Sequence, residues 1–378
     1  MIRRLAIRMG RAAGLAAILG CALHAAAWGW GGETHHYIAQ HYSQHLPPYL
    51  DGLMQWDMFV DYHVTDPDAR RSSTPGEGYK HYIDIDDYPG FLSGTLSHDR
   101  DTLEAEYGAE TVLDRGVVPW AIGDAVATLT ERFRVQDWDS AALMIADLCH
   151  YVGDASQPLH CTYNYDGLAT GNTGIHSRYE SDMMSLHLGE LTASRVPAVP
   201  PARPLDVVFD LVTAAWADVT PLLRADVDAR AASGGRYDDV YYAALWSATQ
   251  GFTRARIDSA SILTAALVHA AWLDAGHPAV PGSSASYPES VHIAARLDVG
   301  PSPFRDVLSV SFSGPGFLDV DVYDLRGARV ARLAAGTFAG GRASWRPGAG
   351  GPDVPPGLYF VRLHGWKLDL VRRVTFLD

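Results

Sequence analysis

Histidine and carboxylate residues recur at regular spacing in the segment HYVGDASQPLHCTYNYDGLATGNTGIHSRYE. Two pairs are four residues apart, His150 with Asp154 and His176 with Glu180, and His160 lies between the pairs. Residues i and i+4 project from the same face of an α-helix, so each pair can hold a metal ion between its side chains. Imidazole and carboxylate donors without thiolates are typical of zinc or manganese sites that keep a position open for catalysis.

The run H-Y-V-G-D, followed by His160 and then by H-S-R-Y-E, resembles the core motif of the zinc-dependent phospholipase C / S1-P1 nuclease superfamily. The resemblance implies a helical catalytic domain, three zinc ions per chain and hydrolysis of a phosphodiester bond. In that superfamily the mature chain begins with a tryptophan, whose free amine and carbonyl bind a metal. Trp28 lies at the expected cleavage site, and Trp30 takes its place if cleavage falls two residues later.

Three upstream ligands follow from the same resemblance. The segment ETHHYIAQ contains His35 and His36, and we prefer His35 because His36 faces elsewhere on a helix. The segment HVTDPDARR offers Asp66 or Asp68, and the order P-D favours Asp68. The histidine of KHYID is His81.

The resemblance therefore divides the ligands among three zinc ions. The implied set is Trp28, His35, Asp68, His81, His150, Asp154, His160, His176 and Glu180. The first zinc takes Asp68, His81, His150 and Asp154, and the second takes His160, His176 and Glu180. The third takes Trp28 and His35, with Asp154 bridging it to the first.

Clustered cations suit the hydrolysis of a phosphodiester, whose oxygens are negative and whose leaving alkoxide is poor. The cations neutralise phosphate charge, stabilise the leaving oxygen and lower the pKa of water to about 7. Under the resemblance, water between the first and third metals attacks phosphorus, and Asp68 is the candidate catalytic base. Arg178 is a candidate phosphate contact, although a surface ion pair is the simpler expectation.

Two substrates stay open, a phospholipid head group and single-stranded nucleic acid. The H-x-x-x-E form of the last pair and the short gap from His160 to His176 favour phospholipase C activity. A nuclease would need an aromatic platform for a base, and Tyr163, Tyr165 and Tyr179 are candidates that core packing explains equally well. The net charge of -14 disfavours long polyanions. A further alternative is a zinc-stabilised surface binding protein without activity.

Residues 1–27 have the features of a secretory signal peptide. Four arginines precede an apolar run too short to span a membrane, and Ala25-Ala26-Ala27 fits the small-x-small cleavage signal. We expect a secreted, periplasmic or cell-surface protein that begins at Trp28; lipoprotein cleavage before Cys21 is the weaker alternative. Cys149 and Cys161 remain in the mature chain, either as a disulfide or as two buried thiols.

Residues 28–282, the predicted catalytic domain, show helical periodicity. Apolar residues recur every three or four positions in segments 120–133, 139–154, 206–223 and 259–274. After residue 290 the pattern alternates between apolar and polar residues, in segments 307–312, 318–325 and 357–363. The predicted fold class is therefore mainly α with a small C-terminal β-sandwich.

Residues 290–378 contain VYDLRGARV and PPGLYFVRL, and they resemble immunoglobulin-like C-terminal modules of the FlgD-like and sorting type. The resemblance implies attachment to a secretion or cell-surface apparatus, and passive stabilisation is an equal alternative. We predict transient contact of the protein with a membrane surface, and we predict no protein partner.

Overall fold

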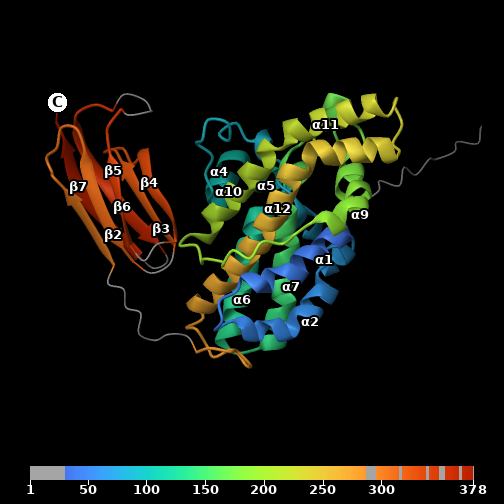
Figure 1. Ribbon diagram of the computed structural model, residues 1–378, viewed down its shortest axis with the longest axis horizontal. Helices are drawn as coiled ribbons and strands as arrows, with labels where there is room; N and C mark the ends of the chain where they lie inside the picture. The colour runs from blue at the N-terminus through green and yellow to red at the C-terminus, as the bar shows by residue number, and fades with distance from the viewer. Residues whose placement is uncertain are drawn as a thin grey trace, which may run out of the picture.

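The computed structural model describes residues 30–286, 295–314, 317–337, 340–348, 354–365 and 368–377. The first part is helical and the last part consists of strands, which confirms the predicted fold class (Figure 1). The predicted leader and Trp28 lie outside the described residues. Within the described residues, no helix has both the length and the apolar character that crossing a membrane requires.

The α-helices are α1 (Gly32–His41), α2 (Asp57–His63), α3 (Asp66–Arg70), α4 (Arg100–Tyr107), α5 (Ala109–Asp114), α6 (Val118–Arg134), α7 (Trp138–Ser156), α8 (Ile175–Ser177), α9 (Met184–His187), α10 (Pro204–Ala217), α11 (Val219–Ala232) and α12 (Asp239–Asp274). The shorter helical turns are η1 (Tyr42–His45), η2 (Asp51–Trp56), η3 (Glu77–His81), η4 (Ile85–Asp87), η5 (Pro158–Cys161), η6 (Leu168–Thr170), η7 (Arg178–Met183) and η8 (Leu188–Glu190).

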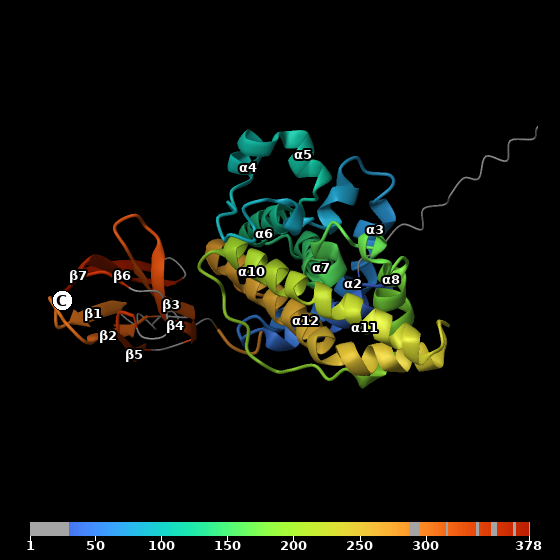
Figure 2. The same cartoon turned by 90° about the horizontal axis from the view of Figure 1, so that it is seen from above.

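Helix α7 is the central element of the helical part. It packs against α6, α12 and α2, and Figure 2 shows it enclosed among helices. At its start, the side chain of Asp137 accepts a hydrogen bond from the backbone N–H of Ser140, which caps the helix. Every residue from Leu148 to Ser156 is buried, so polar side chains in this stretch face other protein groups rather than solvent.

The segment 206–223, predicted as one continuous pattern, forms two helices instead. Helix α10 ends at Ala217 and α11 begins at Val219. Pro221 lies in the first turn of α11 and has no N–H to donate to the carbonyl of Ala217. The chain therefore turns at Asp218 although the apolar spacing continues.

The C-terminal strands are β1 (Arg296–Gly300), β2 (Leu308–Ser313), β3 (Phe317–Tyr323), β4 (Arg329–Thr337), β5 (Gly340–Trp345), β6 (Gly357–Gly365) and β7 (Leu368–Phe376). They form two sheets with strand orders β1-β2-β5 and β4-β3-β6-β7, and all paired strands are antiparallel. The inward-facing side chains form a hydrophobic core separate from that of the helices, as the alternating sequence pattern predicts. The exact domain limits and the sorting-type resemblance stay predictions.

The carboxylate of Asp57, at the start of α2, gives a testable pH dependence. Burial raises the pKa of Asp57 from 3.8 to about 6, against the lowering effect of hydrogen bonds from Ser43 and Tyr42. Because the folded state binds this proton more tightly than the unfolded state, the stability it contributes is present below pH 3.8 and is lost as the pH rises through about 6. Asp57→Asn is therefore expected to be more stable than wild type above pH 7.

Urea denaturation between pH 4 and pH 8 measures this difference, which should shrink as the pH falls. Asp228→Asn, on the exposed side of α11, is the matched control because it removes a carboxylate that faces solvent. An Asp57→Asn difference that stays constant across the pH range contradicts the prediction.

Candidate metal centre

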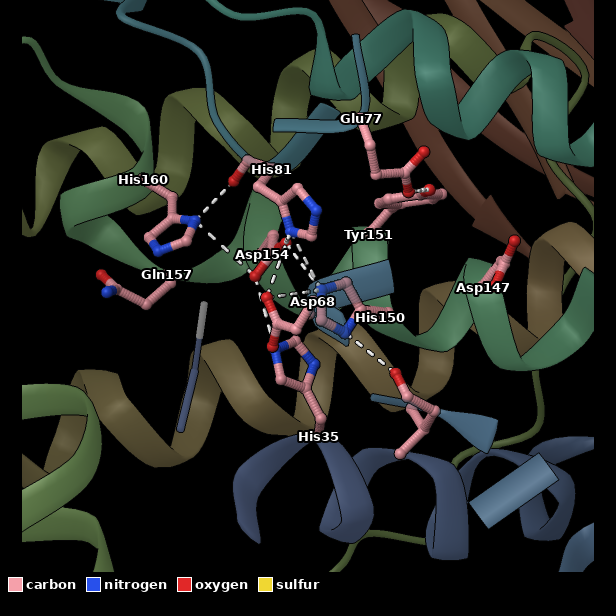
Figure 3. Close-up of polar contacts among 12 residues, drawn as sticks. His35, Asp68, Glu77, His81, Asp147, His150, Tyr151, Asp154, Gln157 and His160 are labelled. Atoms are coloured by element: carbon pink, nitrogen blue, oxygen red, sulfur yellow. Dashed lines mark hydrogen bonds and ion pairs between the residues drawn. The ribbon is translucent and has the colours of Figure 1, made fainter. Parts of the chain in front are cut away.

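Asp154 lies at the centre of a buried group of histidines from separate segments (Figure 3). Its carboxylate oxygens lie 3.4 Å from His35 Nε2, 2.9 Å from His81 Nδ1, 3.3 Å from His150 Nε2 and 3.6 Å from His160 Nδ1. His150 and Asp154 come from adjacent turns of α7, as the four-residue spacing predicts. One carboxylate thus connects α1, η3, α7 and η5.

A first group of donors consists of Asp68, His81 and His150. The Nε2 atom of His150 lies 3.1 Å from Nδ1 of His81, and Asp68 Oδ1 lies 3.7 Å from each of these atoms. Both carboxylate oxygens of Asp68 are buried without a hydrogen-bond partner. Donors around tetrahedral zinc, at about 2.0–2.1 Å from the ion, are separated by roughly 3.3 Å. The spacing and the unpaired carboxylate therefore fit a zinc ion.

A second group consists of His160, His176 and Glu180. The two Nε2 atoms lie 3.1 Å apart, and Glu180 Oε2 lies 2.9 Å from His176 Nε2 and 3.7 Å from His160 Nε2. The side-chain amide of Gln157 donates to the same carboxylate at 3.1 Å. Three protein donors in one place leave room for a fourth ligand, which is the arrangement of a catalytic rather than a closed structural zinc site.

Backbone carbonyls orient three of these histidines. A carbonyl oxygen only accepts, so in each case Nδ1 carries the proton and Nε2 presents its lone pair to the centre. The bonds run from His150 to Val64 at 2.9 Å, from His160 to His81, and from His176 to Tyr165 at 3.2 Å. Metal-binding histidines are commonly held in this way, so the ring orientations also fit a bound cation.

His35 reaches the centre from α1, whereas His36 does not. The ring of His35 stacks on that of His150 at a centroid distance of 4.0 Å, and it is completely buried. Neither of its ring nitrogens has a hydrogen-bond partner. His36 is more exposed and bonds to Asp61 at 2.8 Å. Together with His150 and Asp154, His35 makes the third group of donors.

The glycine of the H-Y-V-G-D run allows this close approach. A Cβ atom at Gly153 would lie 3.0 Å from Nδ1 of His35 and 3.2 Å from Cδ1 of Ile38. We expect Gly153→Ala to push α1 away and to destabilise the protein by about 1–3 kcal/mol, the usual range for overpacking.

Gly123 provides the matched control because it lies inside α6, where an added Cβ atom would have no neighbouring atom within 4 Å. Gly123→Ala is expected to stabilise the protein by about 0.5–1 kcal/mol, since alanine favours the helix. Thermal denaturation of both variants compares the two effects. Equal and favourable shifts would show that His35 tolerates a side chain at position 153.

The structure separates the alternatives for the remaining predicted ligands. Asp66 has a side chain that is 47% exposed and pairs with His63 at 2.7 Å, so Asp68 and not Asp66 faces the centre. Trp28 lies outside the described residues. Trp30 is completely buried, and its indole N–H donates to the hydroxyl of Ser156 at 3.0 Å.

Burial and neighbouring charges shift the pKa values of the carboxylate and the imidazoles at the centre in different directions. Burial would raise the pKa of Asp154, but His150 and His160 outweigh it and hold that pKa well below its usual range. Burial, reinforced by His150, lowers the pKa of His35. Burial opposes a charge on His160, yet Asp154 and Glu180 raise its pKa. Positive charge is thus drawn to the middle of the group.

Arg178 does not form the predicted surface ion pair and does not face the donors. Its side chain is buried and pairs with buried Asp226 at 3.0 Å. The prediction was wrong. Arg178 lies two residues from both His176 and Glu180, which is about half a helical turn, so its side chain points away from theirs, toward α11 and α12.

The three candidate platform tyrosines divide into two kinds. Tyr179 is completely buried and bonds to Thr253 at 2.8 Å, so it belongs to the core. Tyr163 and Tyr165 are 56% and 50% exposed, and the ring of Tyr165 meets that of His176 edge-on at 5.8 Å. Cys149 and Cys161 are free and buried, so the alternative of a disulfide between them is not realised.

Sequence reasoning missed a set of residues that support the donors from behind. Glu77 is buried and accepts hydrogen bonds from Tyr151 and from Arg70, the latter at 3.1 Å. The ring of Tyr151 packs edge-on against His81 and His150. The position of Tyr151 inside the H-Y-V-G-D run could have indicated its role in the sequence. No local sequence pattern indicates the role of Glu77.

No protein-family model matches the chain, and no match was found among curated proteins. Among the solved structures that match in backbone are two clostridial toxins. The alpha-toxin of Clostridium perfringens, isolated from avian strain SWCP, has a TM-score of 0.42 and 11% identity, covering 94% of this chain and 98% of the toxin. The alpha toxin of Clostridium absonum has a TM-score of 0.37 and 11% identity, covering 93% and 97%. At TM-scores this low, the likeness carries no conclusion about activity.

Proposed function

We propose that this chain is an exported, zinc-dependent phosphodiester hydrolase, with phospholipase C-like activity favoured. The observation that carries the proposal is the convergence of three buried donor groups, two of which share His150. Structural zinc sites are usually closed and rich in cysteine, whereas these groups contain only imidazole and carboxylate donors. An open position beside His160, His176 and Glu180 is what a hydrolytic site needs.

Bound divalent cations would supply neutralisation of phosphate charge and a water molecule of lowered pKa. The protein's part is to hold the donors in place and to exclude bulk solvent. Asp68 is proposed as both ligand and base because its two oxygens make no other hydrogen bond. His81 Nδ1 and His150 Nε2 each lie 3.7 Å from its Oδ1 atom.

We propose Trp30, rather than Trp28, as the residue whose free amine completes the third zinc site with His35. The indole of Trp30 is anchored to Ser156, two residues after Asp154, and it packs against Tyr179 at 5.4 Å. The residues before it, Ala27-Trp28-Gly29, also present small residues at the positions that a signal peptidase reads. N-terminal sequencing of the exported protein distinguishes Trp30 from Trp28.

A single-strand nuclease is the second candidate function. Tyr163 and Tyr165 are exposed in the segment that joins His160 to His176, and a base could stack on either ring. Glu180, which gives the last pair its H-x-x-x-E form, supports a phospholipid as the substrate. The C-terminal sandwich is proposed as an attachment module, in line with its sequence resemblance.

The deciding experiment offers the zinc-loaded, full-length exported protein three substrates in parallel. These are phosphatidylcholine vesicles, single-stranded DNA and the small diester bis-p-nitrophenyl phosphate. We expect hydrolysis of the small diester and of phosphatidylcholine, both lost in His150→Ala. Cleavage of DNA alone, weakened in Tyr165→Ala, would support the nuclease instead. Zinc binding without turnover of any of the three would leave the non-enzymatic binding protein.

A further inference from the structure

Arg178 occupies an unusual place, between the two donors His176 and Glu180 but facing away from them. It begins η7, a π-helical turn that runs from Arg178 to Met183. Such turns are rare and often occur at functional sites. The turn sets how far the carboxylate of Glu180 lies from the ring of His176, so whatever supports it also sets the second donor group.

The guanidinium of Arg178 contacts several groups, of which Tyr241, Asn172 and Asp226 are buried. It donates to the hydroxyl of Tyr241, to two backbone carbonyls and to Asp226, and it lies over the ring of Tyr237. The distances are 3.0 Å to Tyr241 Oη, 2.9 Å to Thr173 O, 3.1 Å to Asn172 O, 3.0 Å to Asp226 Oδ1 and 4.2 Å to the Tyr237 centroid. Because a guanidinium is planar and its N–H donors have fixed directions, several partners together hold the chain around Arg178 in one position.

Asp226 closes this network from α11. It is 1% exposed and accepts hydrogen bonds from Arg178, from Tyr241 and from Asn172, the last at 2.7 Å. Asn172 belongs to the segment leading into His176, and Tyr241 belongs to α12. The network therefore ties the chain before His176, at Asn172, and the chain between the two donors, at Arg178, to two helices that contribute no donor themselves.

The first donor group has a separate support. Glu77, Arg70 and Tyr151 form hydrogen bonds with one another behind His81 and His150, and Arg70 also pairs with Asp147 at 2.6 Å. None of these residues belongs to the network around Asp226. The first and the second donor groups are thus supported by separate sets of ionic contacts.

We propose that Arg178 and Asp226 are positioning residues for the second metal group, so that losing them empties the second zinc site and leaves the first occupied. The proposal rests on the proposed function because it takes the two donor groups as zinc sites. Outer partners of metal ligands typically change metal affinity by 10–100-fold when they are replaced. We expect a loss of that size at the second site alone.

The test compares variants of the full-length exported protein by zinc titration, and it locates the bound zinc by anomalous diffraction. Asp226→Asn removes the charge that Arg178 faces. Arg178→Lys keeps that charge but cannot make the forked contacts. Glu77→Gln is the matched control, because it disturbs the first support and should weaken the first site while the second site keeps its zinc.

A fourth variant separates positioning from stability. The pair Arg178→Met with Asp226→Leu replaces a buried ion pair by apolar side chains, a change that often leaves stability unchanged or improved. We expect this pair to fold and to bind zinc 10–100-fold more weakly at the second site. Its melting temperature should fall by no more than about 10 °C, the amount that this loss of zinc affinity accounts for. Normal second-site zinc in the folded pair, or in Arg178→Lys, would overturn the proposal. Absence of zinc from wild type would instead overturn the proposed function.

Discussion

Removal of divalent cations is expected to unfold the helical part of the chain, not only to stop its activity. The donors come from α1, α3, η3, α7, η5, α8 and η7, so the cations would join segments that are far apart in sequence. The free energy of metal binding to such a set stabilises the folded state, because the unfolded chain offers no preformed site. Without cations, the buried carboxylate of Asp68 also has no hydrogen-bond partner.

The size of the effect follows from binding linkage. A site held at about 1,000 times its Kd adds about 4 kcal/mol to the free energy of unfolding. In a domain of roughly 150–250 residues, each kcal/mol shifts the melting temperature by about 2–4 °C. Emptying three sites is therefore expected to lower the melting temperature by tens of degrees. Circular dichroism at a helix wavelength, with and without a strong chelator, measures the change.

The C-terminal sandwich supplies an internal control. Its described residues contain no group of metal donors, and its core around Val320 and Val361 is separate from the helical core. The strand signal should therefore persist when the helical signal is lost, and added zinc should restore the helices. If metal analysis shows the zinc gone while the helical transition stays in place, the donor assignment is wrong.

The parts of the centre that sequence could predict are those in which spacing alone fixes geometry. His150 and Asp154 share a helix, so a separation of four residues places both on one face before any tertiary structure is known. The strands of the sandwich followed in the same way from alternation. Local periodicity is sufficient in both cases because the partners lie within one element.

Other residues depend on contacts that no local pattern encodes. The order P-D favoured Asp68, but only the structure showed Asp68 beside His81 and Asp66 paired with His63 away from the centre. Arg178 was misread because its partner Asp226 lies 48 residues away on another helix. Buried ion pairs of this kind are set by how helices pack, so they remain hidden from a reading of one segment at a time.

Asp154→Asn is expected to have the largest effect of any single substitution on activity. The side chain keeps its size, but the amide loses the negative charge that lies within 3.6 Å of four histidines. Under the proposed assignment, both the first and the third zinc ions would lose a charged ligand. We expect hydrolysis of bis-p-nitrophenyl phosphate to fall by more than about 100-fold, beyond the usual range for outer partners of a metal ligand.

Asp139→Asn is the matched control, because it lies at the start of the same helix and its oxygen can still accept from the indole of Trp56. That variant should keep wild-type turnover and zinc content. Elemental analysis of Asp154→Asn should show less zinc per chain, with His160, His176 and Glu180 still occupied because they form a group without Asp154. Full activity and full zinc content in Asp154→Asn would show that the histidines do not share this carboxylate through bound metal, and the proposed centre would have to be abandoned.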